Sequence, residues 1–506
     1  MLSEVTMQLQ AVNPDYTQER KGKFLYFWGK YPHWVITNEI GKEILHRLFR
    51  SAPFEEIVLF YKRETGLTHK EAVKDLHTFL APLIQVGIIH EEGYPPVIPT
   101  VRTQFSVENA AQNITSVVLN PTRACNYRCS HCYTDASQPL PDELSRKEMI
   151  HILKEIAPFM RAKILGFLGG EPLLRKQDVL QVAEYWIRKE KGSATVSTNG
   201  SLIDYHFAQK AADLPLAVQI SLDGANPATC DAVRGKGSWK RAVEGSKISV
   251  KSGAPTWLCM VYHKENFCEL EDFIALGQQL GVSGVRFIPY NYLGRGTSSE
   301  LVKVMPHQMV KKVHTILKKH PEWGDFIDQS FFGNISVIVK SAPRYVYCGS
   351  GLSTLLIESN GDLYPCINLV YPEFRIGNLR EQHFEDLWIN SPILKKIRSL
   401  CVEDTNGKCS FCTVRYLCGM GCRSEIYELT HRITLPTFFC ESWKKSIFEM
   451  CWILDEFPEL HQRITEQRQA WTSQSELLID KRKTQILINH ILQVIEREEK
   501  TKSKPD

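Results

Sequence analysis

The chain lacks the features that mark membrane, secreted and nucleic-acid-binding proteins. No stretch reaches about 18 uninterrupted apolar residues, the length that spans a bilayer, and residues 1–20 lack the basic and apolar segments of a secretory signal. A formal net charge of +4 over 506 residues gives no strong electrostatic reason to bind nucleic acid or an anionic membrane. We therefore expect a cytoplasmic globular protein that binds neither.

Cysteine is absent before Cys125, although the chain contains 15 cysteines, and eight of them lie from Cys348 to Cys440. In a reducing cytosol, thiols serve metals or catalysis more often than disulfides. The uneven spread therefore predicts bound metal clusters.

Residues 1–93 are predicted to form a small domain of their own. Aromatic and β-branched runs at 23–28 and 33–37 have a hairpin pattern. Apolar residues at helical spacing then predict three helices, and a short strand follows Gly87. This order is typical of a winged-helix-like unit. The third helix balances its lysines with acidic residues, whereas a DNA-recognition helix has a denser basic face.

The rest of the chain divides into four parts. Residues 94–113 carry three prolines within seven residues, which predicts a semi-rigid linker. Residues 114–340 alternate strand and helix patterns, which predicts an α/β fold with a parallel sheet. Helices are expected between six strands, at 114–120, 163–168, 194–198, 216–222, 256–262 and 284–289. Six units are too few for a closed eight-stranded barrel. Residues 341–445 lose this alternation, and residues 446–506 return to helical spacing.

The stretch Cys125-Asn-Tyr-Arg-Cys129-Ser-His-Cys132 directly follows the first of these strands. A tetrahedral zinc site needs four ligands, and no neighbouring side chain completes an obvious set. The spacing of three and then two residues is also unusual for zinc. Three close thiolates on one loop suit a [4Fe-4S] cluster whose fourth iron is left open.

Small polar motifs follow three later strands, at the carboxyl ends where a parallel barrel places its reactive groups. They are Gly169-Gly-Glu-Pro172, Ser197-Thr-Asn-Gly200 and Ser221-Leu-Asp-Gly224. In the first, glycines let the backbone approach a ligand, and a carboxylate with free carbonyls accepts an ammonium group. Each motif alone fits an ordinary turn, but the ordered series is unlikely to be a coincidence.

This series resembles the radical S-adenosylmethionine (SAM) family. The resemblance implies a partial (β/α)6 barrel of the TIM type and a [4Fe-4S] cluster on Cys125, Cys129 and Cys132 whose open iron binds SAM. It also implies three groups of SAM contacts: the amino group at Gly169, Gly170, Glu171 and Pro172, the ribose at Ser197, Asn199, Ser221 and Asp223, and the carboxylate at Arg286. Such enzymes cleave SAM to a radical that abstracts hydrogen from carbon.

The second cysteine block resembles the SPASM extension of this family, which holds two auxiliary iron–sulfur clusters. The resemblance implies a distal, [4Fe-4S] cluster on Cys409, Cys412, Cys418 and Cys440, and a nearer cluster on Cys348, Cys366 and Cys422. The nearer cluster is then one ligand short, because Thr354 stands where some members have another cysteine. An open iron, a substrate ligand or a [2Fe-2S] form would each account for this, and Cys401 is a further candidate ligand. A zinc ribbon, the alternative, would use four of these cysteines and leave three over.

Cys259 lies on the fifth predicted strand and has two interpretations. It either donates a hydrogen atom to a substrate radical, as epimerases of this family require, or is a small buried apolar residue.

The N-terminal domain resembles PqqD-like peptide-recognition domains, which bind a leader peptide as an added strand at a sheet edge, beside the third helix. The whole then resembles a maturase that binds a ribosomally made precursor peptide through residues 21–93 and cross-links it by a thioether or carbon–carbon bond. Flavodoxin or ferredoxin is the expected electron donor. The alternatives are a peptide epimerase, a maturase of a small molecule, tetrapyrrole or sulfatase-like protein, and a winged-helix regulator with an iron–sulfur sensor. The regulator would not need the SAM motif series.

Overall fold

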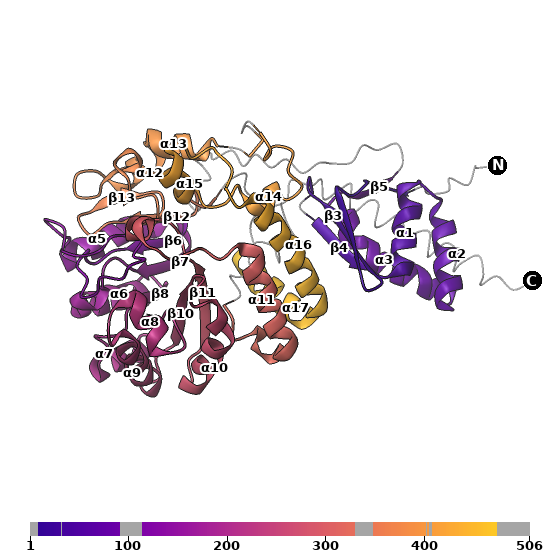
Figure 1. The fold of residues 1–506 in the computed structure, drawn as a ribbon. Helices are drawn as coiled ribbons and strands as arrows, with labels where there is room; N and C mark the ends of the chain where they lie inside the picture. The colour runs from indigo at the N-terminus through magenta and orange to yellow at the C-terminus, as the bar shows by residue number, and fades with distance from the viewer. Residues whose placement is uncertain are drawn as a thin grey trace, which may run out of the picture.

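The computed structural model describes residues 9–31, 33–91, 114–328, 348–400, 402–403 and 407–472. The predicted linker, Cys401 and the end of the predicted C-terminal extension lie outside the described residues. In Figure 1 the sheet and its helices form a large lobe, and the N-terminal domain stands to one side of it.

The centre of the large lobe is a nine-stranded sheet with the order β11-β10-β9-β8-β7-β6-β12-β13-β14. Its first six strands are parallel, and each matches a predicted strand to within three residues at its ends. They are β6 (Ile114–Leu119), β7 (Met160–Phe167), β8 (Ser193–Thr198), β9 (Ala217–Ser221), β10 (Thr256–Tyr262) and β11 (Gly284–Pro289). The predicted α/β fold with a partial barrel is confirmed.

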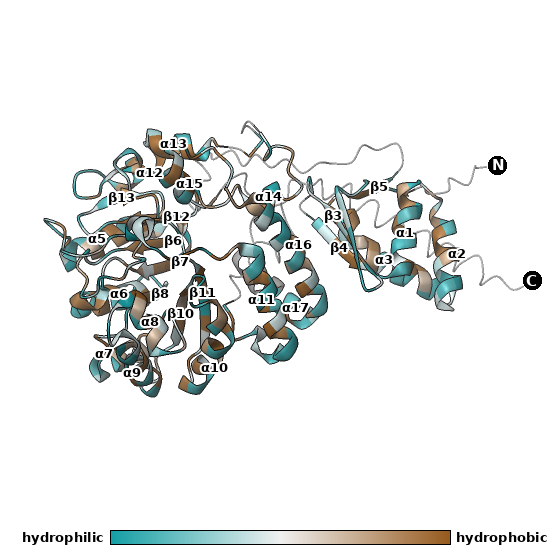
Figure 2. Cartoon of the chain, in the orientation of Figure 1, coloured by the Kyte–Doolittle hydropathy of each residue, from teal (hydrophilic) through white to brown (hydrophobic). Residues whose placement is uncertain are grey.

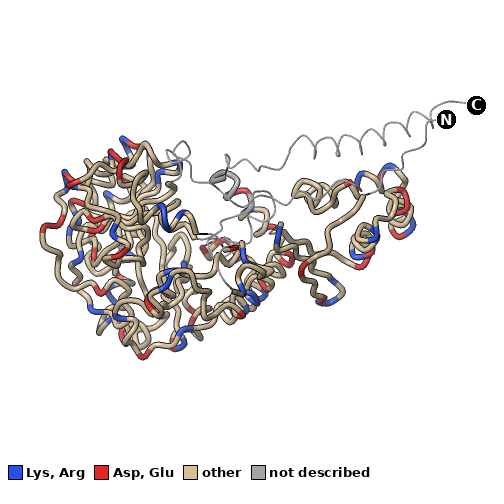
Figure 3. Tube along the Cα trace, turned by 90° about the horizontal axis from the view of Figure 1, so that it is seen from above, with Lys and Arg blue, Asp and Glu red and all other residues tan. Residues whose placement is uncertain are grey.

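Helices connect these strands and cover the outside of the sheet (Figure 1). They are α5 (Arg146–Ile156), α6 (Lys176–Arg188), α7 (Tyr205–Asp213), α8 (Pro227–Arg234), α9 (Ser238–Lys251), α10 (Leu270–Leu280) and α11 (Pro306–Lys319). Figure 2 shows apolar residues on one side of these helices and polar residues on the other, as amphipathic helices over a sheet require. In Figure 3, basic and acidic residues are interspersed along the described chain.

The cysteine-rich part continues the barrel sheet. Strand β12 (Thr354–Ile357) pairs in parallel with β6, and β13 (Asp362–Tyr364) and β14 (Gly377–Asn378) then add antiparallel strands. Short helices complete this part: α12 (Phe384–Asn390), α13 (Pro392–Arg398), α14 (Arg415–Cys418) and α15 (Arg423–Thr430). The second cysteine block is therefore hydrogen-bonded to the strand that precedes the first one.

The N-terminal domain is a three-stranded antiparallel sheet with helices on one face. The predicted hairpin is present as β3 (Lys23–Trp28) and β4 (His33–Thr37), and β2 (Tyr16–Arg20) adds a third strand that the sequence did not predict. The three predicted helices are α1 (Glu39–Phe49), α2 (Phe54–Thr65) and α3 (His69–Gln85). The predicted closing strand, β5 (Ile89–Glu91), pairs with β1 (Leu9–Ala11) in a separate two-stranded sheet.

The other face of this sheet packs on α16 (Cys440–Glu456), which lies between the N-terminal domain and α11 (Figure 1). Phe448 of α16 stacks on Tyr16 with ring centroids 3.9 Å apart. Trp452 Nε1 donates a hydrogen bond to Gln18, and Arg20 pairs with Glu449 at 2.8 Å. The following helix, α17 (Pro458–Thr472), begins two residues after α16 ends. The N-terminal domain is thus docked on the barrel through α16.

None of the helices in the described ranges has both the length and the apolar composition that a membrane span needs.

Candidate iron–sulfur and SAM site

The first three cysteines lie on one loop after β6. Cys132 N donates to Cys129 O at 3.3 Å, and Cys125 N donates to Ser137 O at 3.1 Å, so the loop folds back on itself. Burial raises the pKa of the Cys125 thiol to about 11, and the charges of Cys129 and Cys132 add to this rise. Three thiols within electrostatic reach of one another favour a bound cation, which removes the mutual repulsion of their thiolates.

No three potential ligands in the described part of the chain converge on the position of a single metal ion. A cluster imposes a different condition, because each cysteine of a [4Fe-4S] cluster binds a different iron. The shared loop and the mutual influence of the three thiols therefore fit a cluster better than a mononuclear metal.

The Gly169–Pro172 motif packs directly on this loop. Gly170 N donates to Thr122 O at 2.9 Å, and Glu171 N donates to Ala124 O at 2.8 Å. A Cβ atom added to Gly170 would lie 2.0 Å from Ala124 O, so only glycine allows this contact. The sequence predicted that these glycines let the backbone come close to a ligand. In the structure, Gly170 comes close to the backbone of the cysteine loop instead.

The Glu171 carboxylate joins this motif to the next one. Its side chain is buried and accepts hydrogen bonds from Thr198 Oγ1 at 2.7 Å, Asn199 N at 2.8 Å and Leu173 N at 3.0 Å. Burial raises the pKa of Glu171, and these hydrogen bonds oppose the rise. The carboxylate therefore braces β7 against β8, and its predicted contact with the SAM amino group stays a prediction.

Asn199 extends the same network to the cysteines. Its Nδ2 donates to Asn126 Oδ1 at 2.8 Å, and Asn126 follows Cys125. Ser197, two residues earlier, accepts a hydrogen bond from Gln219 Nε2 at 3.0 Å. The polar motifs after β7 and β8 are thus connected to the cysteine loop and to β9.

Asp223 is completely buried and forms an ion-pair network that the sequence did not predict. Its Oδ2 lies 2.6 Å from Arg234 Nε and 3.0 Å from His131 Nε2, and its Oδ1 accepts from Val261 N at 2.8 Å. Burial alone would raise the pKa of Asp223, but the charge of Arg234 and the His131 contact hold it well below its usual range. Because His131 lies between two of the cysteines, this network fixes the loop to the barrel.

Sequence reasoning found Asp223 but assigned it to a SAM ribose, a role that stays a prediction. His131 and Arg234 were missed as its partners. Arg234 ends α8, the one connecting helix before α11 that was not predicted. The only sign of this pairing in the sequence is that Arg234 lies 11 residues after Asp223.

Cys259 and Arg286 lie side by side on the barrel strands. Ser221 pairs with Cys259, and Cys259 pairs with Arg286, in the registers of β9, β10 and β11. Arg286 Nε lies 3.2 Å from Asp328, and its Nη1 donates to Gln219 at 3.2 Å. Burial raises the pKa of Cys259 to about 12, which keeps an S–H bond at neutral pH, as a hydrogen donor needs. The roles of both residues stay predictions.

The cysteines of the second block separate into two groups. Beyond the effect of burial, the pKa of Cys366 is raised by Cys348 and Cys422, whereas the pKa of Cys418 is raised by Cys412 and Cys409. Cys440 acts on Cys409 in the same way. These neighbours correspond to the two predicted ligand sets. Their binding of two clusters stays a prediction.

One ion pair connects the two cysteine regions. Arg123, two residues before Cys125, pairs with Glu358 of the β12–β13 turn at 3.2 Å, and Asn120 Nδ2 donates to Glu358 at 3.0 Å. Next to Cys132, the Tyr133 hydroxyl has its pKa raised by burial and then by the charges of Cys132, Glu358 and Cys366. Tyr133 thus lies within electrostatic reach of both regions.

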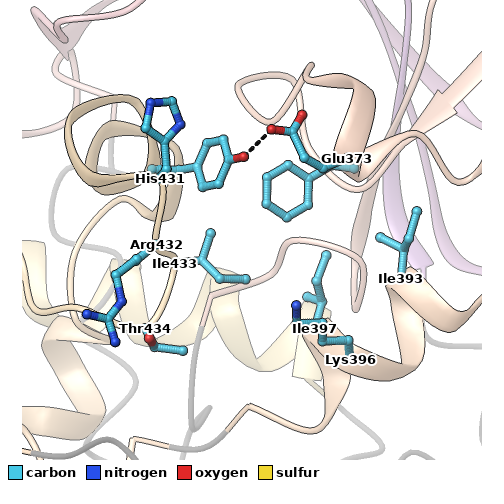
Figure 4. Close-up of a pocket in the computed structure, with 10 residues that line it drawn as sticks. Glu373, Ile393, Lys396, Ile397, His431, Arg432, Ile433 and Thr434 are labelled. Atoms are coloured by element: carbon cyan, nitrogen blue, oxygen red, sulfur yellow. Dashed lines mark hydrogen bonds between the residues drawn. The ribbon is translucent and has the colours of Figure 1, made fainter.

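A cavity of about 340 Å³ lies in the cysteine-rich part, between α13 and the end of α15 (Figure 4). Its apolar lining includes Phe374, Ile397 and Ile433, and Tyr427 donates a hydrogen bond to Glu373 at its edge. No cysteine lines this cavity.

Comparisons with known proteins agree with this arrangement. Residues 119–277 match the model of the radical SAM superfamily, and residues 348–413 match SPASM, an iron–sulfur cluster-binding domain. The mycofactocin maturase MftC of Mycobacterium ulcerans is 31% identical over 308 residues, which cover 60% of this chain and 80% of that protein. The AdoMet-dependent heme synthase of Methanosarcina barkeri is 28% identical over 327 residues, which cover 61% of this chain and 91% of that protein.

Among solved structures, Streptococcus suis SuiB bound to precursor peptide SuiA matches with a TM-score of 0.55 and 15% identity. The match covers 86% of this chain and 100% of SuiB. A match of this length exceeds the stretch from residue 94 to residue 506, so it includes part of the N-terminal domain.

The chain therefore belongs to the radical SAM superfamily and carries a SPASM domain. It is an enzyme whose cofactors are SAM and iron–sulfur clusters, as the motif series implied.

Proposed function

We propose that this enzyme modifies a ribosomally synthesised precursor peptide and forms a thioether or carbon–carbon cross-link in it. The observation that carries the proposal is the docked N-terminal domain. Its sheet has a strand, β4, that pairs only with β3 among the described residues, and α16 holds this sheet against the barrel. A peptide added along β4 would therefore have a fixed position relative to the barrel. The relationship to MftC and the fold of SuiB support this reading.

Ten cysteines would hold the clusters in this proposal. Cys125, Cys129 and Cys132 would hold a [4Fe-4S] cluster that, together with SAM, supplies a 5′-deoxyadenosyl radical for hydrogen abstraction. The two other sets would hold two auxiliary clusters: Cys348, Cys366 and Cys422, and Cys409, Cys412, Cys418 and Cys440. The donor set fits, because soft thiolates are the ligands that iron–sulfur clusters require.

The other residues of the site hold this machinery in place. Glu171 and the Asp223–Arg234–His131 network orient the cysteine loop, and Arg286 would meet the SAM carboxylate as a bidentate donor. Flavodoxin or ferredoxin would supply electrons. If the reaction is epimerisation instead, the neutral Cys259 thiol is the candidate hydrogen donor.

The test is anaerobic incubation of the reconstituted enzyme with peptides encoded by short reading frames beside its gene. Loss of two hydrogens by mass spectrometry is the expected result. Unchanged mass with uptake of solvent deuterium would indicate epimerisation, and an unaltered peptide would contradict the proposal. Hydrogen exchange tests the binding mode, because an added strand should protect amides of β4 (His33–Thr37) from exchange.

A second candidate is a small-molecule or tetrapyrrole substrate, which the heme synthase relative favours. In that case the N-terminal domain only packs against α16. Peptides would then leave the exchange of the β4 amides unchanged, and modification would occur on the small molecule alone.

A further inference from the structure

Arg423 occupies an unusual position in the cysteine-rich part. It follows Cys422 at the first position of α15 and is 2% exposed. Burying a guanidinium costs free energy unless hydrogen bonds and negative charge compensate for it. The side chain therefore needs partners of both kinds.

The hydrogen bonds come from two segments of the chain. Arg423 Nη1 donates to Leu435 O at 2.7 Å and to Ile433 O at 3.0 Å, and Nε donates to Gly421 O at 3.2 Å. Ile433 and Leu435 belong to the segment that runs from α15 to Cys440, the first residue of α16. Ile433 also forms a wall of the cavity in Figure 4. The guanidinium thus connects the turn before it to the segment that positions Cys440.

Two further contacts bring the same segments together. Thr437 N donates to Met420 O at 3.1 Å. A Cβ atom added to Gly421 would lie 2.7 Å from Thr437 Cβ, which shows how closely the segments approach. The turn from Cys418 to Cys422 is therefore packed on the residues that lead into Cys440.

Negative charge is available from the cysteines. Arg423 directly follows Cys422 of the nearer set, and its Nε hydrogen bond to Gly421 O holds the guanidinium at the turn that also carries Cys418 of the distal set. Its Nη1 hydrogen bonds to Ile433 O and Leu435 O place the same cation beside the segment that leads to Cys440 of the distal set. One fixed cation thus lies close to both sets.

We propose that Arg423 is a positioning residue for both auxiliary iron–sulfur sites, in which its fork holds the Cys440 segment against the Cys418–Cys422 turn and its charge raises the reduction potentials of the clusters. Reduction adds negative charge to a cluster, and a cation in a poorly solvated site stabilises that charge. Arginine suits the role because its planar fork bridges two carbonyls and lysine has no such fork. The inference rests on the two ligand sets proposed above.

The test uses the full chain with Cys125, Cys129 and Cys132 all replaced by alanine, so that only auxiliary clusters contribute to the signal. Arg423→Gln and Arg423→Lys are made in this background and reconstituted anaerobically. Iron per chain is measured, and the midpoint potentials are obtained by redox titration followed by electron paramagnetic resonance. Arg398→Gln is the control, because Arg398 is a half-buried arginine of this part that also donates to backbone carbonyls, those of Gly351 and Trp388.

Arg423→Gln should bind less iron, and its remaining clusters should titrate at lower potentials than the parent. Arg423→Lys should also bind less iron but keep the parental potentials, because the charge remains. Loss of all clusters in Arg423→Gln alone would make the charge essential for assembly and would support the proposal too. The proposal would be overturned by any of three results. Both Arg423 variants could bind as much iron as the parent, Arg423→Gln could keep the parental potentials, or Arg398→Gln could lose as much iron as Arg423→Gln. No peptide is present, so a failure of the peptide proposal would leave this result unchanged.

Discussion

The two cysteine regions of this enzyme are held in place by different means. The Cys125–Cys132 loop follows barrel strand β6 and is held by residues with buried carboxylates, Glu171 and Asp223. The carboxylate of Asp223 contacts His131 of the loop as well as Arg234 and Val261 N. Glu171 accepts three hydrogen bonds around β8, and its N–H donates to Ala124 O beside Cys125. Residues 407–440, all of which are described, contain the short helices α14 and α15 and no strand. Of their cysteines, Cys412 and Cys418 pack against the edge of the main core, whereas Met420 and Val402 form a separate small core beside Cys409 and Cys348.

This difference indicates how each region reaches its final structure. The first loop is preorganised by hydrogen bonds and ion pairs from regular elements, so it should keep its shape without metal. Residues 407–440 of the second block contain no strand, and contacts such as those of Arg423 join its turns and short helices only to one another. The fold of this segment should therefore depend on cluster binding, as that of small metal-stabilised domains does. Each of the following experiments would break or sharpen this contrast.

The largest effect is expected from Asp223→Asn. The substitution leaves Arg234 buried without its carboxylate, which costs on the order of 3–5 kcal/mol when a buried ion pair is broken. We expect this loss in the free energy of unfolding, measured by chemical denaturation, together with loss of 5′-deoxyadenosine formation. The control is Glu184→Gln, which removes an exposed ion pair with Arg188 and should change stability by less than about 1 kcal/mol. A comparable change in both variants would contradict preorganisation by the barrel.

Gly170→Ala should damage the first site alone. The new Cβ would collide with the backbone oxygen of Ala124. No side-chain rotation can relieve this collision, so the backbone of the cysteine loop must move. A shift of about 1 Å commonly costs on the order of 100-fold in rate. We expect 5′-deoxyadenosine formation to fall by that factor while the auxiliary clusters keep their paramagnetic signals.

Gly324→Ala is the matched control, because its Cβ would meet side-chain atoms no closer than 3.7 Å. Its activity should equal that of the parent. Loss of the auxiliary signals in Gly170→Ala would mean that the two regions fold as one unit.

The contrast also explains what could be predicted from the sequence. Buried parallel strands are short apolar runs, and so the six barrel strands were located to within a few residues. Strand β12 (Thr354–Ile357) was not assigned. It is only four residues long, and nothing in its sequence shows that it pairs with β6, which lies far away in the chain. Helix α16 was predicted to be helical from its apolar spacing. That spacing shows that Phe448 is buried but not that the N-terminal sheet buries it.

Glu449→Gln tests the helix that begins at the distal site and supports the N-terminal domain. Although burial alone would raise the pKa of Glu449, hydrogen bonds from His314 and Arg20 lower it to about 2. A lowered folded-state pKa contributes stability above the unfolded value near 4.5, and this contribution disappears as the pH falls toward 2. We expect the variant to lose on the order of 2 kcal/mol at neutral pH. Its difference from the parent should shrink between pH 4.5 and 2.

Both proteins should be measured without clusters, since acid releases iron and sulfide. A difference that is independent of pH would show that the Glu449 charge does not stabilise the docked domain.

The smallest effect, and the most direct test of the contrast, is expected from removing the metal. Amide exchange measured with and without clusters should accelerate by about tenfold or more in residues 407–440, because local opening there would no longer be opposed by cluster binding. Amides of β6 to β10 should exchange at the same rate in both forms. The backbone of the Cys125–Cys132 loop should stay close to its metal-bound protection, since Asp223 and Glu171 hold it without iron. Equal acceleration in that loop and in residues 407–440 would show that both regions depend on their clusters, and preorganisation would then not distinguish them.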